Sequence, residues 1–288
     1  MNMHLMGKAK RLNRRAFGGL MAVTTLGAML KTKLVRANVY SNRWLRIERI
    51  SGDVTTLTGQ RKSASVGDYL SSIGHGLITG QRSTAHLAID DGIASVAVAQ
   101  NTQMTIQQLS LLRDGSRVTI LDVSRGQARF QVRRFTHPNS RLELRTPSGV
   151  AAVRGTTFGT SVNQDGQTNR ATIEGQVEAS AQDVRVPINA GMTAIIYPGE
   201  APSAARPLDR ELDIRWEDYE WRGESFYMAG YVDAANRVEV NNQDVSLNRV
   251  GYFEQTIPFN RKLQVVPIIV RNPMGETRTH KVFARVER

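Results

Sequence analysis

RTPSGVAAVRGTTFGT, residues 145–160, sets the pattern for the rest of the chain. A Pro-Ser-Gly turn at 147–149 precedes small apolar residues, and a Val-Arg-Gly-Thr run follows at 153–156. Glycine adopts backbone conformations that are closed to other residues, and threonine hydroxyls bond to nearby backbone groups. The segment holds no acid or base beside a nucleophile. It therefore predicts turn-linked β-strands and an architectural role rather than a catalytic one.

Short strands and turns extend outward from this segment. Alternating apolar and polar residues flank Gly52-Asp53, Asp91-Gly92 and Asp165-Gly166, which is the pattern of strands joined by tight turns. Pro147 is expected to end the strand before it, because proline cannot donate to a sheet ladder. Long helical periodicity is missing. The fold class is therefore predicted to be all-β.

A loose internal repeat occurs within this pattern. Gly52, Gly126 and Gly175 are each expected to open a strand, which a small-residue turn and a second strand follow. Stacked units of this kind predict a β-roll or solenoid-like domain over residues 46–200. Only residues 210–222 suggest a short helix.

The C-terminal part has a different pattern. Residues 201–222 indicate a linker and aromatic-rich connector, since the stretch EAPSAARPL at 200–208 is rich in Pro, Ala and Ser. Residues 223–288 suggest about seven short strands, with turns at Asn241-Asn242 and Pro273-Met274-Gly275. This density of strands predicts a small β-sandwich.

Charge and cysteine content bound the function class. Of the formal net charge of +12, residues 1–37 supply +8 through eight Lys and Arg and no acid, which leaves +4 for the remainder. A mildly basic remainder gives little support to a nucleic-acid partner, and none is expected. The chain has no cysteine, so disulfides, thiol catalysis, cysteine metal sites and a lipid-modified cysteine are excluded.

Residues 1–37 have the three parts of a secretory signal. The basic stretch ends at Arg15, an apolar run covers 16–30, and small residues offer a cleavage site after Ala37. The pair Arg14-Arg15 resembles a twin-arginine signal. The run is shorter than the roughly 20 residues that span a bilayer, so no membrane span is expected after cleavage. An uncleaved anchor or a buried helix is the alternative.

The order and spacing of several motifs over residues 46–200 resemble the FecR domain, a bacterial extracytoplasmic module. The matching residues include Thr146, Pro147, Val153, Arg154, Gly155, Thr156, Phe158, Glu174, Gly175, Val177, Ala190 and Gly191. The segment 223–288 is more loosely similar to the Ig-like accessory domains of envelope proteins. The resemblance implies an all-β periplasmic sensing module followed by an Ig-like sandwich.

The best-known FecR-domain proteins are transmembrane regulators with a cytoplasmic anti-sigma domain. Here 15 residues precede the apolar run that begins at Ala16, too few for such a domain. The resemblance is therefore expected to extend to the periplasmic module and not to the anti-sigma domain.

Arg154 has two interpretations. Its fork of donors suits a carboxylate or phosphate ligand, and it also suits the backbone carbonyls of neighbouring turns. The other motif residues, Thr146, Pro147, Val153, Gly155, Thr156, Phe158, Glu174 and Gly175, are predicted to be mainly structural.

Catalytic and metal-binding patterns find little support. The Asp-Gly pairs lack the spacing of a calcium loop, and the histidines are scattered. No nucleophile motif is present, and Glu217 with Asp218 offers a glycosidase pair only in principle. No catalytic residue, metal or cofactor is therefore expected, and the protein is predicted not to be an enzyme.

The stretch DIRWEDYEWRGESFYMAGY, residues 213–231, is the most distinctive local chemistry. Its aromatic residues alternate with charged ones, a composition that stacks on sugar rings or forms a protein hot spot. Trp216, Tyr219 and Trp221 are the predicted binding residues, together with Arg154. The alternative is that these aromatics join the two domains.

The sequence thus predicts an exported, non-enzymatic protein of the bacterial periplasm or cell envelope. It is expected to bind, scaffold or sense through a partner, either an envelope protein or a cell-wall glycan. A peptidoglycan- or polysaccharide-binding accessory protein is the alternative function, and a glycan hydrolase is a weaker third.

Export through a twin-arginine signal predicts a mature N-terminus near Asn38. Cell fractionation with mass spectrometry is expected to find this form in the periplasm, and to lose it in the Arg14→Lys/Arg15→Lys variant. An intact N-terminus held in the inner membrane would contradict cleavage and indicate an anchored protein.

Overall fold

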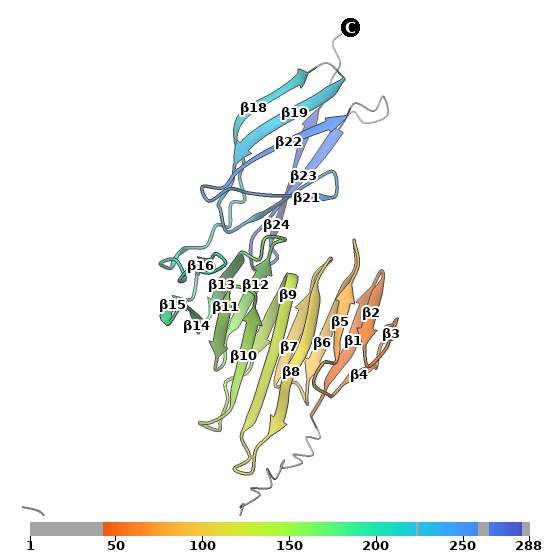
Figure 1. The fold of residues 1–288 in the computed structure, drawn as a ribbon, viewed down its shortest axis with the longest axis vertical. Coiled ribbons are helices and arrows are strands. Elements are labelled where there is room, and N and C mark those ends of the chain that lie inside the picture. Colours follow the sequence, from red (N-terminus) through yellow and green to blue (C-terminus); the bar gives the residue numbers. More distant parts are fainter. Residues whose placement is uncertain (1–42, 223, 259–264, 284–288) are drawn as a thin grey trace, which may run out of the picture. The chain divides into compact units, whose positions relative to one another are not determined.

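The computed structural model of the chain describes residues 43–222, 224–258 and 265–283. This described part contains 24 β-strands and no helix, so the all-β prediction is confirmed (Figure 1). No membrane-spanning helix occurs within these residues. The predicted export residues Arg14, Arg15 and Ala37 lie outside them.

The N-terminal β region, residues 45–207, consists of two sheets that share one strand. Sheet A has the order β4 (Tyr69–Leu70), β1 (Leu45–Ser51), β6 (Thr84–Ile89), β7 (Ala94–Val98), β9 (Arg117–Val132), β12 (Thr157–Val162), β13 (Thr168–Glu174), β16 (Met192–Ile196) and β17 (Arg206–Pro207). Sheet B has the order β3 (Arg61–Ser63), β2 (Val54–Leu57), β5 (Gly76–Thr79), β8 (Gln103–Leu111), β9, β10 (Arg141–Thr146), β11 (Gly149–Val153), β14 (Gln176–Ala181) and β15 (Val184–Asn189). Along the sequence, the chain crosses several times between sheet A and sheet B.

β9 is the shared strand, and Gly126 is the point at which it changes sheets. Up to Arg125 it pairs with β8 and β10, and from Gly126 onward it pairs with β7 and β12. Gly126 has a φ of +91°, and a Cβ there would lie 2.3 Å from the Thr102 hydroxyl oxygen. That hydroxyl accepts a hydrogen bond from the Gln127 N–H at 2.9 Å. The position thus requires glycine for two reasons: its φ is positive, and Thr102 leaves no room for a Cβ.

The prediction of two strands around Gly126, with Gly126 opening a repeat unit, is therefore wrong. The glycine bends one continuous strand and does not end it, because its neighbours keep their ladder bonds on both sides.

The core of the N-terminal β region lies between the two sheets. Leu121 and Leu144 of sheet B and Phe130 and Phe158 of sheet A belong to one buried cluster. The two phenylalanine rings stack with centroids 4.9 Å apart and an angle of 11° between their planes. Alternation of buried and exposed residues along most strands follows from this arrangement, since successive side chains point to opposite faces.

Several predicted turns are confirmed. Asp91-Gly92 lies between β6 and β7, and Asp165-Gly166 lies between β12 and β13. β10 ends at Thr146, directly before Pro147.

The C-terminal sandwich, residues 215–283, consists of two further sheets. Sheet C has the order β18 (Arg215–Arg222), β19 (Ser225–Tyr231) and β22 (Tyr252–Pro258). Sheet D has the order β21 (Gln243–Val245), β20 (Arg237–Val240), β23 (Val265–Arg271) and β24 (Thr277–Phe283). Met228 and Phe253 of sheet C share one buried cluster with Val238 and Ile268 of sheet D.

The suggested helix at 210–222 is wrong, because residues 215–222 form strand β18 and pair with β19. The predicted connector 201–222 therefore contains a strand of sheet C, and β17 near its start pairs with β16 of sheet A. Tertiary pairing overrides the weak local preference here, as it commonly does for short segments. The domain limits 46–200 and 223–288 stay predictions.

The strand order of the sandwich is close to that of an immunoglobulin constant domain. If β18 to β24 are compared with strands A to G, sheet C contains A, B and E, and sheet D contains C, F and G. The difference is β21, the fourth strand, which pairs with β20 and not with β22. The Ig-like assignment itself stays a prediction.

The turn between β23 and β24 joins the C-terminal sandwich to the N-terminal β region. A Cβ on Gly159 of β12 would lie 2.2 Å from the Pro273 carbonyl oxygen, and Met274 is buried against Ala171 of β13. Arg206 forms an ion pair with Asp233 nearby. The predicted alternative, that the aromatic residues of 213–231 join the two domains, stays a prediction.

Substitution of Gly126 is expected to destabilise the fold far more than substitution of Gly115. Both have positive φ, but nothing lies within 4 Å of a Cβ on Gly115. Gly115→Ala should cost about 1 kcal/mol through backbone strain, and Gly126→Ala about 3 kcal/mol or more because Thr102 must also move. Urea unfolding of the two variants measures the difference; equal losses would contradict the steric role of Gly126.

Candidate functional site

The motif residues of 145–175 make their contacts inside the N-terminal β region. Gly155 has a φ of +121°, and a Cβ there would lie 2.6 Å from Arg134 Cα. Thr157, just after the motif's Thr156, donates its hydroxyl to Glu174 Oε2 at 3.1 Å. Val153 and Phe158 are buried in the core. These contacts favour the structural interpretation of the motif.

Arg154 lies at the surface end of this motif. Its Nη2 donates to the Pro138 carbonyl at 2.7 Å, so the guanidinium ties the end of β11 to the loop before β10. This carbonyl contact corresponds to the second of its two predicted interpretations, and its role as a ligand stays a prediction.

Arg170 is a fully buried cation that sequence reasoning missed. It lies on β13 beneath the 146–149 turn, where its Nη2 donates to the Gly149 carbonyl at 2.9 Å and to Thr146 Oγ1 at 3.2 Å. Burial lowers its pKa to about 9, and no carboxylate is among its hydrogen-bond partners in the described part of the chain. The Thr146 hydroxyl also donates to the Gly149 carbonyl, across the turn. Because Arg170 donates to both of these groups, it stabilises the 146–149 turn.

An open groove of about 570 Å³ runs beside the same turn. Arg145 and Arg185 line it together with Asp122 and Asp183, so its charges balance. No aromatic side chain is among its lining residues, and its two arginines and two aspartates leave no excess of positive or negative charge that would attract a charged ligand.

The three predicted aromatic binding residues lie on one face of β18 because of a bulge. The pairing shifts between Trp216 and Asp218, so that Trp216 lies opposite Gly230 while Tyr219 lies opposite Met228. A bulge places two residues opposite one, and here it brings Tyr219 onto the same face as Trp216. Trp221, opposite Phe226, shares this face.

This face is the inner one, directed toward the sandwich core. Trp216 and Trp221 are partly buried and pack against the core cluster, at 6.3 Å from the Phe253 ring and 5.3 Å from the Phe226 ring respectively. Tyr219 is 58% exposed, because β18 is an edge strand whose inner face is only partly covered. The structure therefore leaves Tyr219 as the most open ring of the three.

The outer face of sheet C carries a second aromatic group, which we call the tyrosine face. It consists of Tyr227, Tyr231, Tyr252, Arg215, Arg222 and Glu254. Asp218 and Glu220 point to the same face, and both form ion pairs with Arg222. Tyr231 lies opposite both Arg215 and Tyr252, and the two tyrosine rings are 5.2 Å apart. All three tyrosine side chains are half-buried.

Arginine side chains cover two rings of the tyrosine face. The Arg215 guanidinium lies 4.3 Å from the centroid of Tyr231, and that of Arg222 lies 3.6 Å from the centroid of Tyr227. Stacking of this kind fixes the arginine side chain before a partner binds. It also occupies ring faces that a sugar would need for stacking.

Hydrogen bonds connect the tyrosine hydroxyls to an acid. Tyr227 and Tyr252 both donate to Glu254 Oε2, at 3.0 and 3.2 Å, and their hydroxyl oxygens are 3.4 Å apart. The bond with Tyr227, then desolvation, then the bond with Glu254 raise the pKa of Tyr252. Sequence reasoning grouped Tyr227 and Tyr231 with the tryptophans and missed Tyr252 and Glu254, which come from a strand about twenty residues later.

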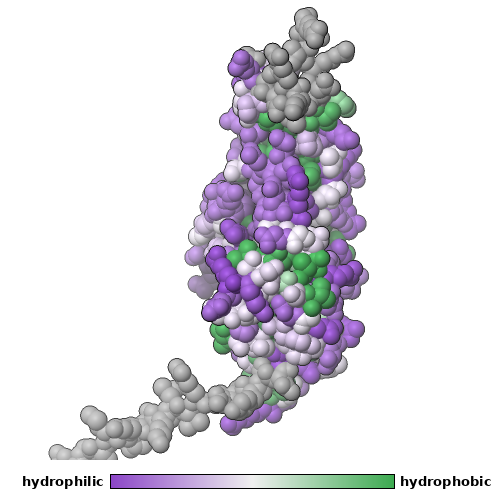
Figure 2. Space-filling model, turned by 90° about the vertical axis from the view of Figure 1, so that its right-hand side faces the viewer, coloured by the Kyte–Doolittle hydropathy of each residue, from purple (hydrophilic) through white to green (hydrophobic). Residues whose placement is uncertain are grey.

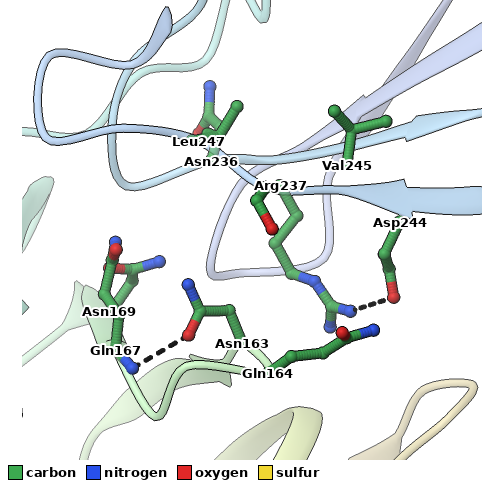
Figure 3. A pocket seen from close by; sticks show the side chains of 10 residues that line it. Asn163, Gln164, Gln167, Asn169, Asn236, Arg237, Asp244, Val245 and Leu247 are labelled. Atoms are coloured by element: carbon green, nitrogen blue, oxygen red, sulfur yellow. Dashed lines mark hydrogen bonds and ion pairs between the residues drawn. The ribbon is translucent and has the colours of Figure 1, made fainter. Parts of the chain in front are cut away.

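Half of the residues that line the small pocket in Figure 3 carry amide side chains. Asn163 and Gln167 of the N-terminal β region face Asn236 and the Arg237–Asp244 ion pair of the C-terminal sandwich. Its volume is about 40 Å³, which suits a few water molecules and excludes a sugar or cofactor.

Apolar surface gathers on the side that carries β2 to β5. Figure 2, which views that side, shows apolar surface bordered by hydrophilic residues. The exposed large side chains here are Tyr69 of β4 and, in the turns on either side of β4, Val66 and Ile73; they are 53%, 65% and 72% exposed.

No group of three or more His, Asp or Glu residues in the described part of the chain is arranged for a metal ion. Asp218, half of the conceivable glycosidase pair with Glu217, forms an ion pair with Arg222.

Removal of the Tyr227 hydroxyl is expected to lower the pKa of Tyr252. A folded pKa above the unfolded value of about 10 means that Tyr252 stabilises the fold below pH ~10 and loses this contribution as pH rises through the folded pKa. In Tyr227→Phe, Tyr252 should therefore titrate closer to pH 10, as measured by NMR of ¹³C-labelled tyrosine. Tyr69→Phe is the control; an unchanged Tyr252 titration in Tyr227→Phe would contradict the arrangement.

Comparison with known proteins bears on the N-terminal β region. Residues 76–178, from the start of β5 into β14, match the family model described as FecR protein. None of the curated proteins matches the chain significantly.

Among solved structures, two crystal structures of a "putative anti-sigma factor" from Parabacteroides distasonis resemble the chain at 16% identity, with TM-scores of 0.39 and 0.38. Each likeness covers 46% of this chain and 60% of the other. The family match confirms the resemblance noted in the sequence: residues 76–178 of this chain form a FecR-family domain.

Proposed function

We propose that this protein is a non-enzymatic binding module that acts in signal transduction or scaffolding through a protein partner. The observation that carries the proposal is the tyrosine face of the C-terminal sandwich, which lies on the same chain as the FecR-family domain. Regulatory activity is what the family match suggests. The partner is an envelope protein, and the location is the bacterial periplasm, as the N-terminal signal predicts.

The composition of the tyrosine face suits a protein partner. Tyrosine and arginine are enriched at interface hot spots, because they combine large contact area with directional hydrogen bonds. Arg215 and Arg222 are held on the rings of Tyr231 and Tyr227, which reduces the entropy lost on binding. The face stands on a three-stranded sheet, so its residues keep a fixed spacing.

The contacts of the aromatic residues weigh against the glycan-binding alternative. Sugar stacking needs open ring faces, yet Trp216 and Trp221 pack into the sandwich and two tyrosine rings carry arginines. Tyr219 remains as an exposed ring for a glycan. This alternative therefore predicts a contribution from Tyr219 and little from Tyr231 or Tyr252.

Site-specific photo-crosslinking tests the proposal. A benzoylphenylalanine at Tyr252, in the exported protein in its own cells, is expected to give a discrete adduct with an envelope protein. Tyr231→Ala in the same chain should reduce that adduct at least tenfold, since it removes the ring beside Tyr252. The same probe at Tyr69, an exposed tyrosine of the N-terminal β region, is the control.

Two results would overturn the proposal. One is the absence of any adduct at Tyr252 while the Tyr69 probe gives one. The other is retention of the protein on purified sacculi that Tyr219→Ala abolishes and Tyr231→Ala leaves intact, which would support the glycan alternative.

A further inference from the structure

The long edges of the C-terminal sandwich are protected to different degrees. β18 carries five charged residues and a bulge, two features that block pairing with another strand. β21 has only three residues. β24 is flanked by the 211–212 segment, because Arg278 donates to the Glu211 carbonyl at 2.8 Å and His280 Nε2 lies 2.7 Å from the Leu212 carbonyl.

β22 is the exception, since it is a seven-residue edge strand with the sequence YFEQTIP and a single charge, Glu254. Its one ladder partner among the described residues is β19. At its start the Tyr252 carbonyl accepts a bond from the Asn248 N–H. Within the described part of the chain, residues 253–257 have no other backbone–backbone bond beyond that ladder, and the Gln255 side-chain amide donates to the Thr256 carbonyl at 3.1 Å.

The open edge follows from the path of β21. In an immunoglobulin constant domain the fourth strand belongs to the same sheet as the first, second and fifth. Here β21 pairs with β20 in sheet D, so that β22 becomes an edge of sheet C. An unpaired row of backbone donors and acceptors is a template for a further strand.

The sequence of β22 is complementary to itself in the antiparallel direction. In an antiparallel pair of strands, residues directly opposite each other point to the same face of the sheet. If two β22 strands are related by a two-fold axis that passes beside a residue, the inner side chains of one copy therefore lie opposite inner side chains of the other. Only an axis at Gln255 sets all seven residues of the strand opposite one another; the outermost pair, Tyr252 and Pro258, adds no backbone hydrogen bond because Pro258 has no N–H and the Tyr252 carbonyl already accepts from Asn248. This axis places Phe253 opposite Ile257, and Glu254 opposite Thr256, of the second copy.

This register satisfies the side chains on both faces. Phe253 and Ile257 already belong to the inner, apolar face of sheet C, and they would meet as cross-strand pairs. An axis at Glu254 would set two carboxylates directly against each other, which is unfavourable. With the axis at Gln255, the two Glu254 carboxylates are not opposite each other. The residues on the axis are then the Gln255 side chains of the two copies, which are uncharged amides.

We propose that two copies of this chain associate through β22 in antiparallel register about a two-fold axis at Gln255. Sheet C then continues from one copy into the next as six strands, three from each. The tyrosine faces of the two copies lie on the same side of this joint sheet, because the axis preserves the inner and outer faces. A dimer of this kind presents its partner with two equivalent sites.

A single introduced cysteine tests the position of the axis. The chain has no cysteine, so any disulfide in the purified full chain must join two introduced residues. Gln255→Cys places two thiols directly opposite, within reach of a disulfide, and is expected to give a covalent dimer on mild oxidation. Gln107→Cys, an exposed position on β8, is the control. Cross-linking of Gln107→Cys as fast as Gln255→Cys would overturn the proposal.

A charge exchange at the same residue provides a second test. Gln255→Lys and Gln255→Glu each set like charges across the axis, and each should weaken the dimer at least about tenfold in sedimentation equilibrium. An equimolar mixture is expected to restore association, because opposite charges then meet. Gln107→Lys should leave the dimer unchanged, and far-ultraviolet circular dichroism verifies that each variant is folded. A wild-type chain that sediments as a monomer at all concentrations, or a mixture that stays monomeric, would overturn the proposal.

Discussion

The bend of β9 at Gly126 is the constraint on which the N-terminal β region depends. The first half of β9 pairs with β8 and β10, and its second half pairs with β7 and β12. The two sheets are thereby joined covalently at the centre of the stack. Leu121 and Phe130, nine residues apart on this strand, consequently enter the same core from opposite sheets. Any side chain at Gly126 would collide with Thr102, so the joint exists only because the residue has none.

Arg170 provides the second link between the sheets. Its backbone belongs to β13 in sheet A, while its guanidinium binds the turn between β10 and β11 of sheet B. Arg170 has no carboxylate partner among the described residues, so its burial is costly, and the turn's carbonyl and hydroxyl oxygens offset part of that cost. The Thr-Pro-Ser-Gly turn is thus held from below by a residue far along the chain. The motif of the FecR-family domain is accordingly better understood as a set of tertiary contacts than as an active centre.

The candidate binding surface arises in the C-terminal sandwich from a division of aromatic residues between two faces. The bulge in β18 sends Trp216, Tyr219 and Trp221 to the inner face, and the regular pairing of β19 with β22 sends Tyr227, Tyr231 and Tyr252 to the outer one. The inner group stabilises the sandwich, and the outer group is arranged by arginine stacking and by Glu254. The proposed binding surface and the sandwich core therefore draw on neighbouring aromatic residues that point to opposite faces of sheet C. The open edge of β22 lies beside the outer group, so association of two copies would place two such faces together.

The sequence by itself determined the all-β class, the positions of most turns and the exclusion of thiol chemistry. These features depend on local conformation, such as the positive φ that glycine accepts at Gly92 and Gly166, and on residue types alone. The aromatic-rich stretch 213–231 was noted in the sequence, but the binding residues predicted from it, Trp216, Tyr219 and Trp221, lie on the inner face and not on the tyrosine face. Only the tertiary structure decided that Gly126 bends a strand, that Arg170 is buried, and that Trp216 points inward while Tyr231 points outward. Each of these depends on pairing between strands distant in sequence, and a bulge of one residue reverses the face that a local pattern predicts.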